Sequence, residues 1–418
     1  MKKNMKNKKK HILFFSDCFI YGGCEIVIAN LMNSELIHQK YDIKYSYRYF
    51  DVYDKTARKK IEAKWHNTLL PQRLLSNDSI FYFFDLERRK GLYYRIIKKI
   101  LYHAKKIGIY YIYNYCTLFF LFKKQNPDIL FINNGGYPGS ELCRLSALVA
   151  KKCKVKKIVF NVNNIAFKPE TKKEIKEINK INNIVHCFIT ASMAAKNALS
   201  QNAGFDINKI VTIPNTINEK ILNIESGKLK KEFNMETNTI ILGSAGLLTK
   251  RKGFNVLIKA ISEVLKKEDI PDFIVFIFGE GEEREALENL IRKQNLTNVF
   301  LPGNKEDVLS YMTDFNIFIL PSIGYEDMPY VIIEAMMLKK PIIGTNVAGI
   351  PEEVDTGKTG FVVTPNNEIE LSSAIIQLLN NKELCKTFSE QGFKRYNDLF
   401  HYDIIIKRYM YLFENLLQ

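Results

Sequence analysis

The sequence predicts an α/β protein with two doubly wound, Rossmann-like domains. Its 418 residues exceed what a single hydrophobic core usually organises, so we expect two domains of about 200 residues each. Short apolar runs of strand length alternate with longer helical patterns in both halves of the chain, which is typical of βαβ units and parallel sheets. A polar stretch without strand character, residues 219–236, separates the two series and is expected to be a linker.

The first series, residues 1–215, would form the N-terminal domain. It begins with a basic tail, Met1–Lys10, for which we expect disorder. Residues 50–107 are aromatic and basic, and no period assigns them to strand or helix. The remaining apolar patterns predict strands at Ile12–Ser16, Tyr41–Tyr49, Asp128–Asn133, Lys157–Val162, Ile184–Thr190 and Lys209–Ile213, with helices at Glu25–Met32, Gly139–Ala150, Glu170–Ile181 and Ser192–Ser200.

The second series, residues 237–399, would form the C-terminal domain. Its patterns predict strands at Thr239–Gly243, Asp272–Phe278, Asn298–Leu301, Phe315–Leu320 and Pro341–Thr345, with helices at Phe254–Lys266, Glu283–Lys293, Pro329–Lys339 and Glu370–Leu379. Residues 384–418 also have a helical pattern.

One aromatic stretch of the first half allows three interpretations. Gly108–Phe122 contains fifteen uncharged residues, rich in Tyr and Phe, between two pairs of lysines. It fits a buried helix, a helix lying in a membrane interface, or a membrane span. A span needs about 20 apolar residues, which is more than this stretch offers.

The formal net charge of +16 is unevenly placed. Residues 1–215 carry 38 Lys and Arg against 16 Asp and Glu, a net +22, whereas residues 216–418 carry 23 against 29, a net −6. A basic half implies an anionic partner such as a membrane surface, a phosphorylated lipid or nucleic acid. A lysine-rich composition of the whole genome would give the same excess without such a partner.

Cysteine and histidine usage argues against a metal site or a disulfide framework. The seven cysteines are scattered without CxxC spacing, and the six histidines show no metal-ligand spacing. Reduced thiols in a cytosolic compartment fit this pattern best. The apolar run Ile12–Ser16 is too short for the core of a signal peptide.

Two acids in the second half stand where an α/β sheet binds ligands. Glu326 lies in a loop after the predicted strand Phe315–Leu320, and Glu334 lies on the first turns of the helix that follows Pro329. Ligands of open α/β sheets bind beyond the carboxyl ends of strands, and free N–H groups at a helix start favour an anion.

The stretch from Pro321 to Met336 resembles the Glu-x7-Glu signature of retaining, nucleotide-sugar-dependent glycosyltransferases of the GT-B fold, family four type. The family form is roughly P-S-x-x-E-G-x-P-x-x-x-x-E-A-M, and this chain departs from it at Asp327, where Gly is usual. The resemblance implies two Rossmann-like domains facing across a cleft, with a final helix, about residues 400–418, that crosses back onto the first domain.

The resemblance also implies roles for these residues. Glu326 would contact hydroxyls of the donor sugar, and Glu334 would bind the ribose diol. A carboxylate suits both tasks because it accepts two hydrogen bonds from neighbouring hydroxyls. The segment Asp327, Met328, Pro329 and Tyr330 would hold sugar and phosphate through its backbone.

A second motif resembles the family's phosphate loop, G-R-L-x-x-x-K-G. The segment begins at Gly246 and places Lys252 at the family lysine, while Leu247 stands where the family has Arg. Arg251 would then supply the second cation. Such cations are needed because negative charge grows on the departing nucleotide. Gly279 and Gly281 match the family's G-x-G turn beside the base.

The first half carries fewer matching residues. Gly22 and Gly23 occupy a loop that, in the family, lies near the donor phosphates and the acceptor, and Ile213–Asn218 resembles the segment that ends the first domain. Asn163 stands after a predicted strand, where some family members have a His. The acceptor-side catalytic group is therefore left open.

These residues imply a retaining, metal-independent hexosyltransferase that needs no cofactor beyond a nucleotide-sugar donor such as a UDP-sugar. The acceptor would be a glycan or a lipid-linked glycan of bacterial cell-surface polysaccharide, such as capsule or lipopolysaccharide. The expected place is the cytoplasm, peripheral on the inner face of the membrane, at an anionic surface and without nucleic acid. A sugar-nucleotide epimerase and a non-catalytic, membrane-associated relative stay open as alternatives.

Overall fold

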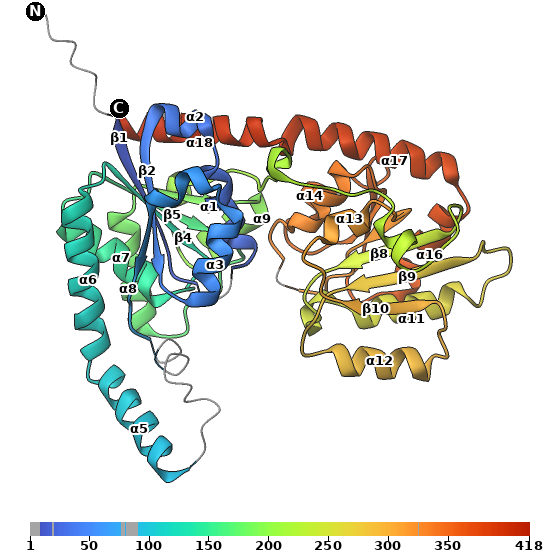
Figure 1. Cartoon of the computed structure of the whole chain (residues 1–418), viewed down its shortest axis with the longest axis horizontal. Helices are drawn as coiled ribbons and strands as arrows, with labels where there is room; N and C mark the ends of the chain where they lie inside the picture. The colour runs from blue at the N-terminus through green and yellow to red at the C-terminus, as the bar shows by residue number, and fades with distance from the viewer. Residues whose placement is uncertain (1–8, 19–20, 77–79, 81–90, 325) are drawn as a thin grey trace, which may run out of the picture. The chain divides into compact units, whose positions relative to one another are not determined.

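The computed structural model describes residues 9–18, 21–76, 80, 91–324 and 326–418. Most of the basic tail for which disorder was expected, residues 1–8, therefore lies outside the described residues. The chain forms two compact units (Figure 1). Unit 1 comprises Met1–Thr190, Lys196–Thr212 and Ile406–Gln418, and unit 2 comprises Ala191–Ala195 and Ile213–Ile405.

Unit 1 is built on a seven-stranded parallel sheet with the order β3-β2-β1-β4-β5-β6-β7. Its strands are β1 (Lys10–Ser16), β2 (Tyr41–Arg48), β3 (Leu69–Gln72), β4 (Ile129–Asn134), β5 (Lys157–Val162), β6 (Cys187–Thr190) and β7 (Ile210–Thr212). The central strands are buried on both faces, which explains why they read as continuous apolar runs.

Helices cover both faces of this sheet. The helices of unit 1 are α1 (Gly23–Met32), α2 (Glu35–Lys40), α3 (Asp51–Lys60), α5 (Leu92–Lys106), α6 (Ile109–Gln125), α7 (Glu141–Lys152), α8 (Lys172–Ile184) and most of α9 (Met193–Gln201). Of these, α5 buries no residue and does not cover the sheet. Leu13 and Phe15 face a core shared with α6, α7 and α8. On the other face, Phe131 contacts Tyr409 and Phe413 of α18 (Tyr402–Leu417), whose residues from Ile406 onward belong to unit 1.

Unit 2 has a six-stranded parallel sheet with the order β10-β9-β8-β11-β12-β13. Its strands are β8 (Ile240–Ala245), β9 (Phe273–Phe278), β10 (Val299–Gly303), β11 (Ile317–Ile319), β12 (Ile342–Thr345) and β13 (Gly360–Val363). The two sheets confirm the prediction of two Rossmann-like domains. The strand β13 was not predicted.

Two layers of helices sandwich the second sheet. One face is covered by α11 (Phe254–Val264), α12 (Arg284–Lys293) and α16 (Glu368–Leu379). The other carries α13 (Val308–Met312) and α14 (Tyr330–Met337). The helix α15 (Ile350–Glu353) follows β12, and α17 (Lys382–Arg395) continues through a π-helical turn, Tyr396–Phe400, toward α18.

Residues 219–236, for which a linker was expected, lie within unit 2 and contain the short helix α10 (Lys228–Glu232). Leu229 of this helix is fully buried. The backbone N–H groups of Leu229 and Lys230 donate to one carboxyl oxygen of Asp314, at 2.9 and 3.1 Å. These contacts fasten the segment to the domain, although its polar composition suggested a free connection.

The unassigned residues 50–107 contain α3, β3 and α5 in their described part. The stretch Gly108–Phe122 falls on α6, which buries one face, as the buried-helix interpretation predicts, and exposes the other. The interfacial interpretation stays a prediction. Among the described residues, no helix combines the length and the apolar character that crossing a bilayer requires.

Candidate active site

The reversal of strand order places two loops side by side at the edge of each sheet. In unit 2 the order reverses between β8 and β11, which are neighbours, so the loops that follow these two strands leave from the same edge. This switch point is where open α/β sheets bind ligands. The loop after β8 carries Arg251 and Lys252, and the loop after β11 carries Glu326.

These loops bring two cations onto one carboxylate. The Nζ of Lys252 and an Nη of Arg251 each lie 2.6 Å from the same oxygen of Glu326. The hydroxyl of Ser322 donates to that oxygen as well, at 3.2 Å. The side chains of Lys252 and Glu326 are 9% and 8% exposed, whereas that of Arg251 is 35% exposed. The cluster has one surplus positive charge before any ligand arrives.

Leu247, at the position of the family arginine, is 63% exposed. It lies on the loop after β8, as do Arg251 and Lys252. Arg251 and not residue 247 therefore provides the second positive charge next to Glu326.

The backbone of the phosphate-type loop is fixed by the turn after β9. The N–H of Gly246 donates to the carbonyl of Phe278 at 2.9 Å, and that of Leu248 donates to the carbonyl of Glu280 at 2.9 Å. A Cβ at Gly279, whose φ is +143°, would lie 1.9 Å from the carbonyl oxygen of Gly246. Glycine at this position is thus required by the close approach of the two loops.

Asp327, next to Glu326, is buried within a group of carboxyls. One of its oxygens accepts a hydrogen bond from the hydroxyl of Ser192, and the other has no partner among the described residues. Burial raises the pKa of Asp327 to about 7, and the neighbouring charges of Glu352 and Glu326 add to that shift. Asp327 therefore changes charge near neutral pH, unlike an ordinary Asp.

Glu352 and Glu353, on α15, have opposite environments. The carboxylate of Glu352 accepts from the N–H groups of Met193 and Ala194, at 2.8 and 2.7 Å, at the start of α9. Glu353 is fully buried, and neither of its carboxyl oxygens has a hydrogen-bond partner among the described residues. Burial, reinforced by the charge of Asp327, raises the pKa of Glu353 well above its ordinary value.

The other predicted donor residues lie close to this cluster in the sequence and surround the start of α14. Pro329 stands just before the first helical residue, Tyr330, so the helix begins one residue later than predicted. Met328 is buried, and its carbonyl accepts from the side-chain amide of Asn215 at 2.7 Å. Glu334 is half-buried on α14.

Unit 1 has a comparable switch point between β1 and β4. Gly22 caps the helix α1, which begins at Gly23. Its N–H donates to a carboxyl oxygen of the buried Glu25 at 3.1 Å, and the thiol of Cys24 donates to the same oxygen at 2.8 Å. Cys18 lies 3.9 Å from Cys24, sulfur to sulfur, and these contacts raise the pKa of the Cys24 thiol. The scattered sequence positions gave no sign of this cluster.

Asn163 belongs to a network of asparagines at the ends of β4 and β5. Its side-chain N–H donates to the side-chain oxygen of Asn133 at 2.8 Å and to the carbonyl of Asn134 at 2.7 Å. The side chain of Asn161 donates to both Asn133 and Asn163, at 2.9 Å each. These bonds hold the amide of Asn163 in one orientation.

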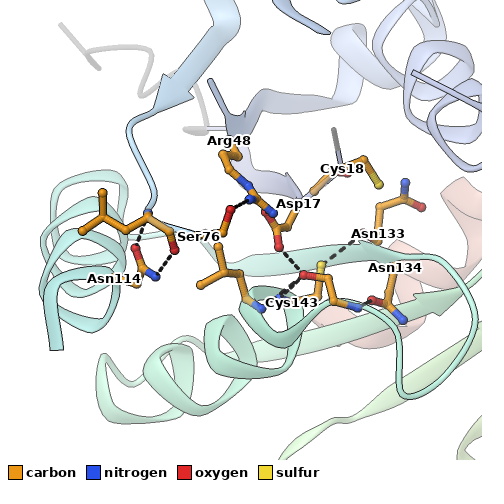
Figure 2. Close-up of polar contacts among 12 residues, drawn as sticks. Asp17, Cys18, Arg48, Ser76, Asn114, Asn133, Asn134 and Cys143 are labelled. Carbon is orange, nitrogen blue, oxygen red and sulfur yellow. Dashed lines mark hydrogen bonds and ion pairs between the residues drawn. The ribbon is translucent and has the colours of Figure 1, made fainter. Parts of the chain in front are cut away.

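A cavity of about 430 Å³ in unit 1 was missed by the sequence analysis. Its lining includes an ion pair between Asp17 and Arg48, both almost completely buried (Figure 2). Asp17 also accepts from the hydroxyl of Ser140 at the start of α7, and Arg48 donates to Ser76 (Figure 2). On α6, the side chain of Asn114 bonds both backbone groups of Leu75, at 2.7 and 2.9 Å. Because Asp17 and Arg48 neutralise each other, the cavity offers polar atoms without a net charge from this pair.

Comparison with known proteins finds similarity to glycosyltransferases. The family model described as "Glycosyl transferases group 1" matches residues 225–395. An uncharacterized glycosyltransferase of Methanocaldococcus jannaschii, MJ1178, is 30% identical over 54% of this chain and 59% of its own length. The capsular polysaccharide biosynthesis glycosyltransferase CapM of Staphylococcus aureus is 28% identical over 53% of this chain and 56% of its own.

The chain also shares its fold with solved structures. Anabaena HepE in complex with UDP superposes with a TM-score of 0.74 at 16% identity, covering 97% of this chain and all of that one. The two sequence relatives align over little more than half of their own lengths. The structural likeness establishes the GT-B fold, and the residues matched by the family model lie within unit 2.

Proposed function

Because residues 225–395 match the family model of the group 1 glycosyl transferases and the chain has the GT-B fold, we propose that the protein transfers a sugar from a nucleotide diphosphate sugar to a glycan or lipid-linked acceptor. The proposal rests mainly on one observation: the two cations and the carboxylate that meet at the switch point of unit 2. A diphosphate needs cations, and a sugar needs hydrogen-bond acceptors. HepE, which shares the fold, was crystallised with UDP, so UDP is the first nucleotide to test.

In this proposal Lys252 and Arg251 bind the donor diphosphate and stabilise the charge that develops as the glycosidic bond breaks. Glu326 then exchanges its cation contacts for hydroxyls of the donor sugar. Glu334 binds the ribose diol, and the backbone between Asp327 and Tyr330 contacts sugar and phosphate. The two cations would take the place of a divalent metal, which makes the reaction metal-independent.

We further propose that transfer retains the configuration at the anomeric carbon. The departing phosphate oxygen would accept the proton of the attacking acceptor hydroxyl on the same face of the sugar. The bond from the anomeric carbon to the nucleotide breaks as the bond to the acceptor oxygen forms. No protein nucleophile is needed on this route. Its signature would be an α-linked product from an α-linked donor, which NMR of the isolated product can read.

The acceptor would bind to unit 1. The cavity above the Asp17–Arg48 pair offers buried carboxylate, guanidinium, hydroxyl and amide groups without surplus charge, which suits the hydroxyls of a sugar. Gly22 and Gly23 leave room for a close approach of the backbone to the ligand. The similarity to CapM supports a role in cell-surface polysaccharide assembly. We also propose that the enzyme acts at the inner face of the membrane.

Calorimetric titration of the full chain with UDP and GDP tests the donor site, with Lys252→Ala as the matched variant. We expect micromolar to millimolar binding of one nucleotide, weakened at least tenfold in the variant. Failure of the native protein to bind either nucleotide would favour a non-catalytic relative. An epimerase would instead release an altered, free sugar nucleotide in the absence of any acceptor.

A further inference from the structure

The helix α5 consists of exposed and half-buried residues. None of the fifteen residues of Leu92–Lys106 is buried. Figure 1 shows α5 extending beyond the sheet of unit 1, away from the end of α6. Three large apolar side chains, Leu92, Ile96 and Ile100, are 68%, 49% and 61% exposed. Isolated exposed apolar residues are ordinary, but several on one short helix mark a surface that binds something.

These side chains form a stripe with a basic border. Leu92, Ile96 and Ile100 follow each other at a spacing of four, so they span an arc of about 80° on the helix. Arg95 and Lys99 lie on the arc next to that stripe, at about 20–60° from Leu92. An apolar stripe with cations along its border is typical of a helix that lies in a membrane interface.

The outward face of α6 also carries exposed apolar side chains. α6 buries Tyr110, Asn114, Leu118, Leu121 and Phe122 against unit 1. Its opposite side exposes a second stripe, Ile109, Ile112, Tyr113 and Phe120, which are 50%, 61%, 43% and 69% exposed. The buried face explains why the helix is stable, but it does not explain this second stripe.

The charge of both helices indicates what kind of partner they would bind. The 37 residues from Gly91 to Pro127 contain seven Lys or Arg and no Asp or Glu. The cations are Arg95, Lys98, Lys99, Lys105, Lys106, Lys123 and Lys124. A second copy of this chain would set these cations against one another across a symmetric interface, which is unfavourable. A surface of anionic lipids offers phosphates to the cations and acyl chains to the apolar side chains.

We propose that α5 and the outward face of α6, named here the α5–α6 surface, seat the protein on an anionic membrane. The α5–α6 surface comprises the exposed residues of Leu92–Lys106 and of Ile109–Gln125. The proposed membrane contact rests on the proposed function, which places the enzyme at the membrane. The cavity of unit 1 is also lined by Lys105, Tyr110 and Tyr111 of these two helices. When the α5–α6 surface lies on the membrane, this cavity would therefore lie next to the lipid headgroups. This cavity would therefore suit an acceptor that is a glycan carried on a lipid.

Vesicle flotation with the full chain tests the α5–α6 surface. The probes are vesicles of phosphatidylcholine alone and of phosphatidylcholine with phosphatidylglycerol, each at low and high salt. Native protein should float with the anionic vesicles at low salt and largely dissociate from them at high salt. Ile96→Ser with Ile100→Ser should lower the partition at least tenfold, and Lys99→Gln with Lys106→Gln should lower it by about fivefold for each lysine.

Matched controls come from unit 2. Leu265→Ser with Ile369→Ser removes two apolar side chains of similar exposure, 48% and 59%. Lys382→Gln with Lys386→Gln removes two exposed cations of α17. Both controls should float like the native protein, and every variant should keep the native melting temperature and UDP affinity.

Three results would overturn the proposal. They are equal binding to neutral and anionic vesicles, full binding by the α5 variants, and concentration-dependent self-association that the α5 variants abolish in sedimentation. The UDP titration keeps this test separate from that of the proposed function. A protein that binds UDP but not vesicles refutes the membrane seat alone, and one that binds vesicles but no nucleotide refutes the donor site alone.

Discussion

Replacing Glu326 with Gln should tighten the binding of UDP and abolish sugar transfer. In the free protein one oxygen of this carboxylate lies 2.6 Å from Lys252 and 2.6 Å from Arg251, so its charge offsets one of theirs. A diphosphate must compete with Glu326 for the same cations. UDP lacks the donor sugar that Glu326 would contact, so removing the carboxylate charge removes only the competitor for the cations. A donor sugar, in contrast, loses its hydroxyl acceptor.

The magnitude follows from the burial of the cluster. Two unit charges at about 4–6 Å interact by about 3–4 kcal/mol at an effective dielectric of about 20. Lys252 is almost buried, but the side chain of Arg251 is 35% exposed, so solvent screens part of this energy. We expect a net gain of about 1–2 kcal/mol, which corresponds to a Kd for UDP that is about fivefold to thirtyfold lower.

Calorimetry with UDP measures this directly, and Glu383→Gln serves as the control because it removes one exposed acidic charge on α17. The control should bind UDP like the native protein. High salt should reduce the gain of Glu326→Gln, since its origin is electrostatic. A folded Glu326→Gln protein that binds UDP equally or more weakly would mean that the two cations do not face the diphosphate.

Three further predictions concern the same unit. Lys252→Ala should lower kcat by about a hundredfold or more, and Arg251→Ala should lower it by about tenfold because its cation is more exposed. Leu247→Arg should rescue the Arg251→Ala enzyme in steady-state assays. Absence of rescue would mean that residues 247 and 251 do not reach the same phosphate. Glu334→Ala should raise the Kd for UDP about tenfold in calorimetry with little change in kcat, and an unchanged Kd would remove Glu334 from the ribose site. Glu353→Gln should raise the melting temperature, and more at pH 8 than at pH 5. Burial raises the pKa of Glu353 well above its ordinary value, so the carboxyl lowers the free energy of unfolding increasingly as pH rises above that ordinary value. An equal gain in melting temperature at both pH values would contradict this assignment.

The sequence predicted most central strands and the loops that follow them for a simple reason. Strands such as β8 and β5 are buried on both faces, so each is a short run of apolar residues that ends where a polar loop begins. The loops with Lys252 and Glu326 could therefore be placed at strand ends. Their meeting was predicted only through the family resemblance, because no local pattern shows that β8 and β11 are neighbours.

Features that depend on distant contacts escaped prediction. The buried pair Asp17–Arg48 joins residues 31 positions apart, and Ser140 reaches Asp17 across 123 positions. Glu353 reads as an exposed acid in a polar stretch, yet the close packing of α15 buries it. The sequence of α5 contains an amphipathic period. However, the tyrosines and the leucine next to the stripe widen the apolar arc, so the stripe could not be recognised from the sequence.

The most direct measurement of the central claim is mass spectrometry of products from the full chain with a panel of UDP- and GDP-sugars and lipid extracts, run in parallel with the Lys252→Ala variant. We expect one donor that yields a lipid-linked acceptor heavier by a single sugar residue, with release of the nucleoside diphosphate. We also expect that the variant loses this product while remaining folded. A free, epimerised sugar nucleotide without any glycosylated acceptor, or equal product from native protein and variant, would contradict it.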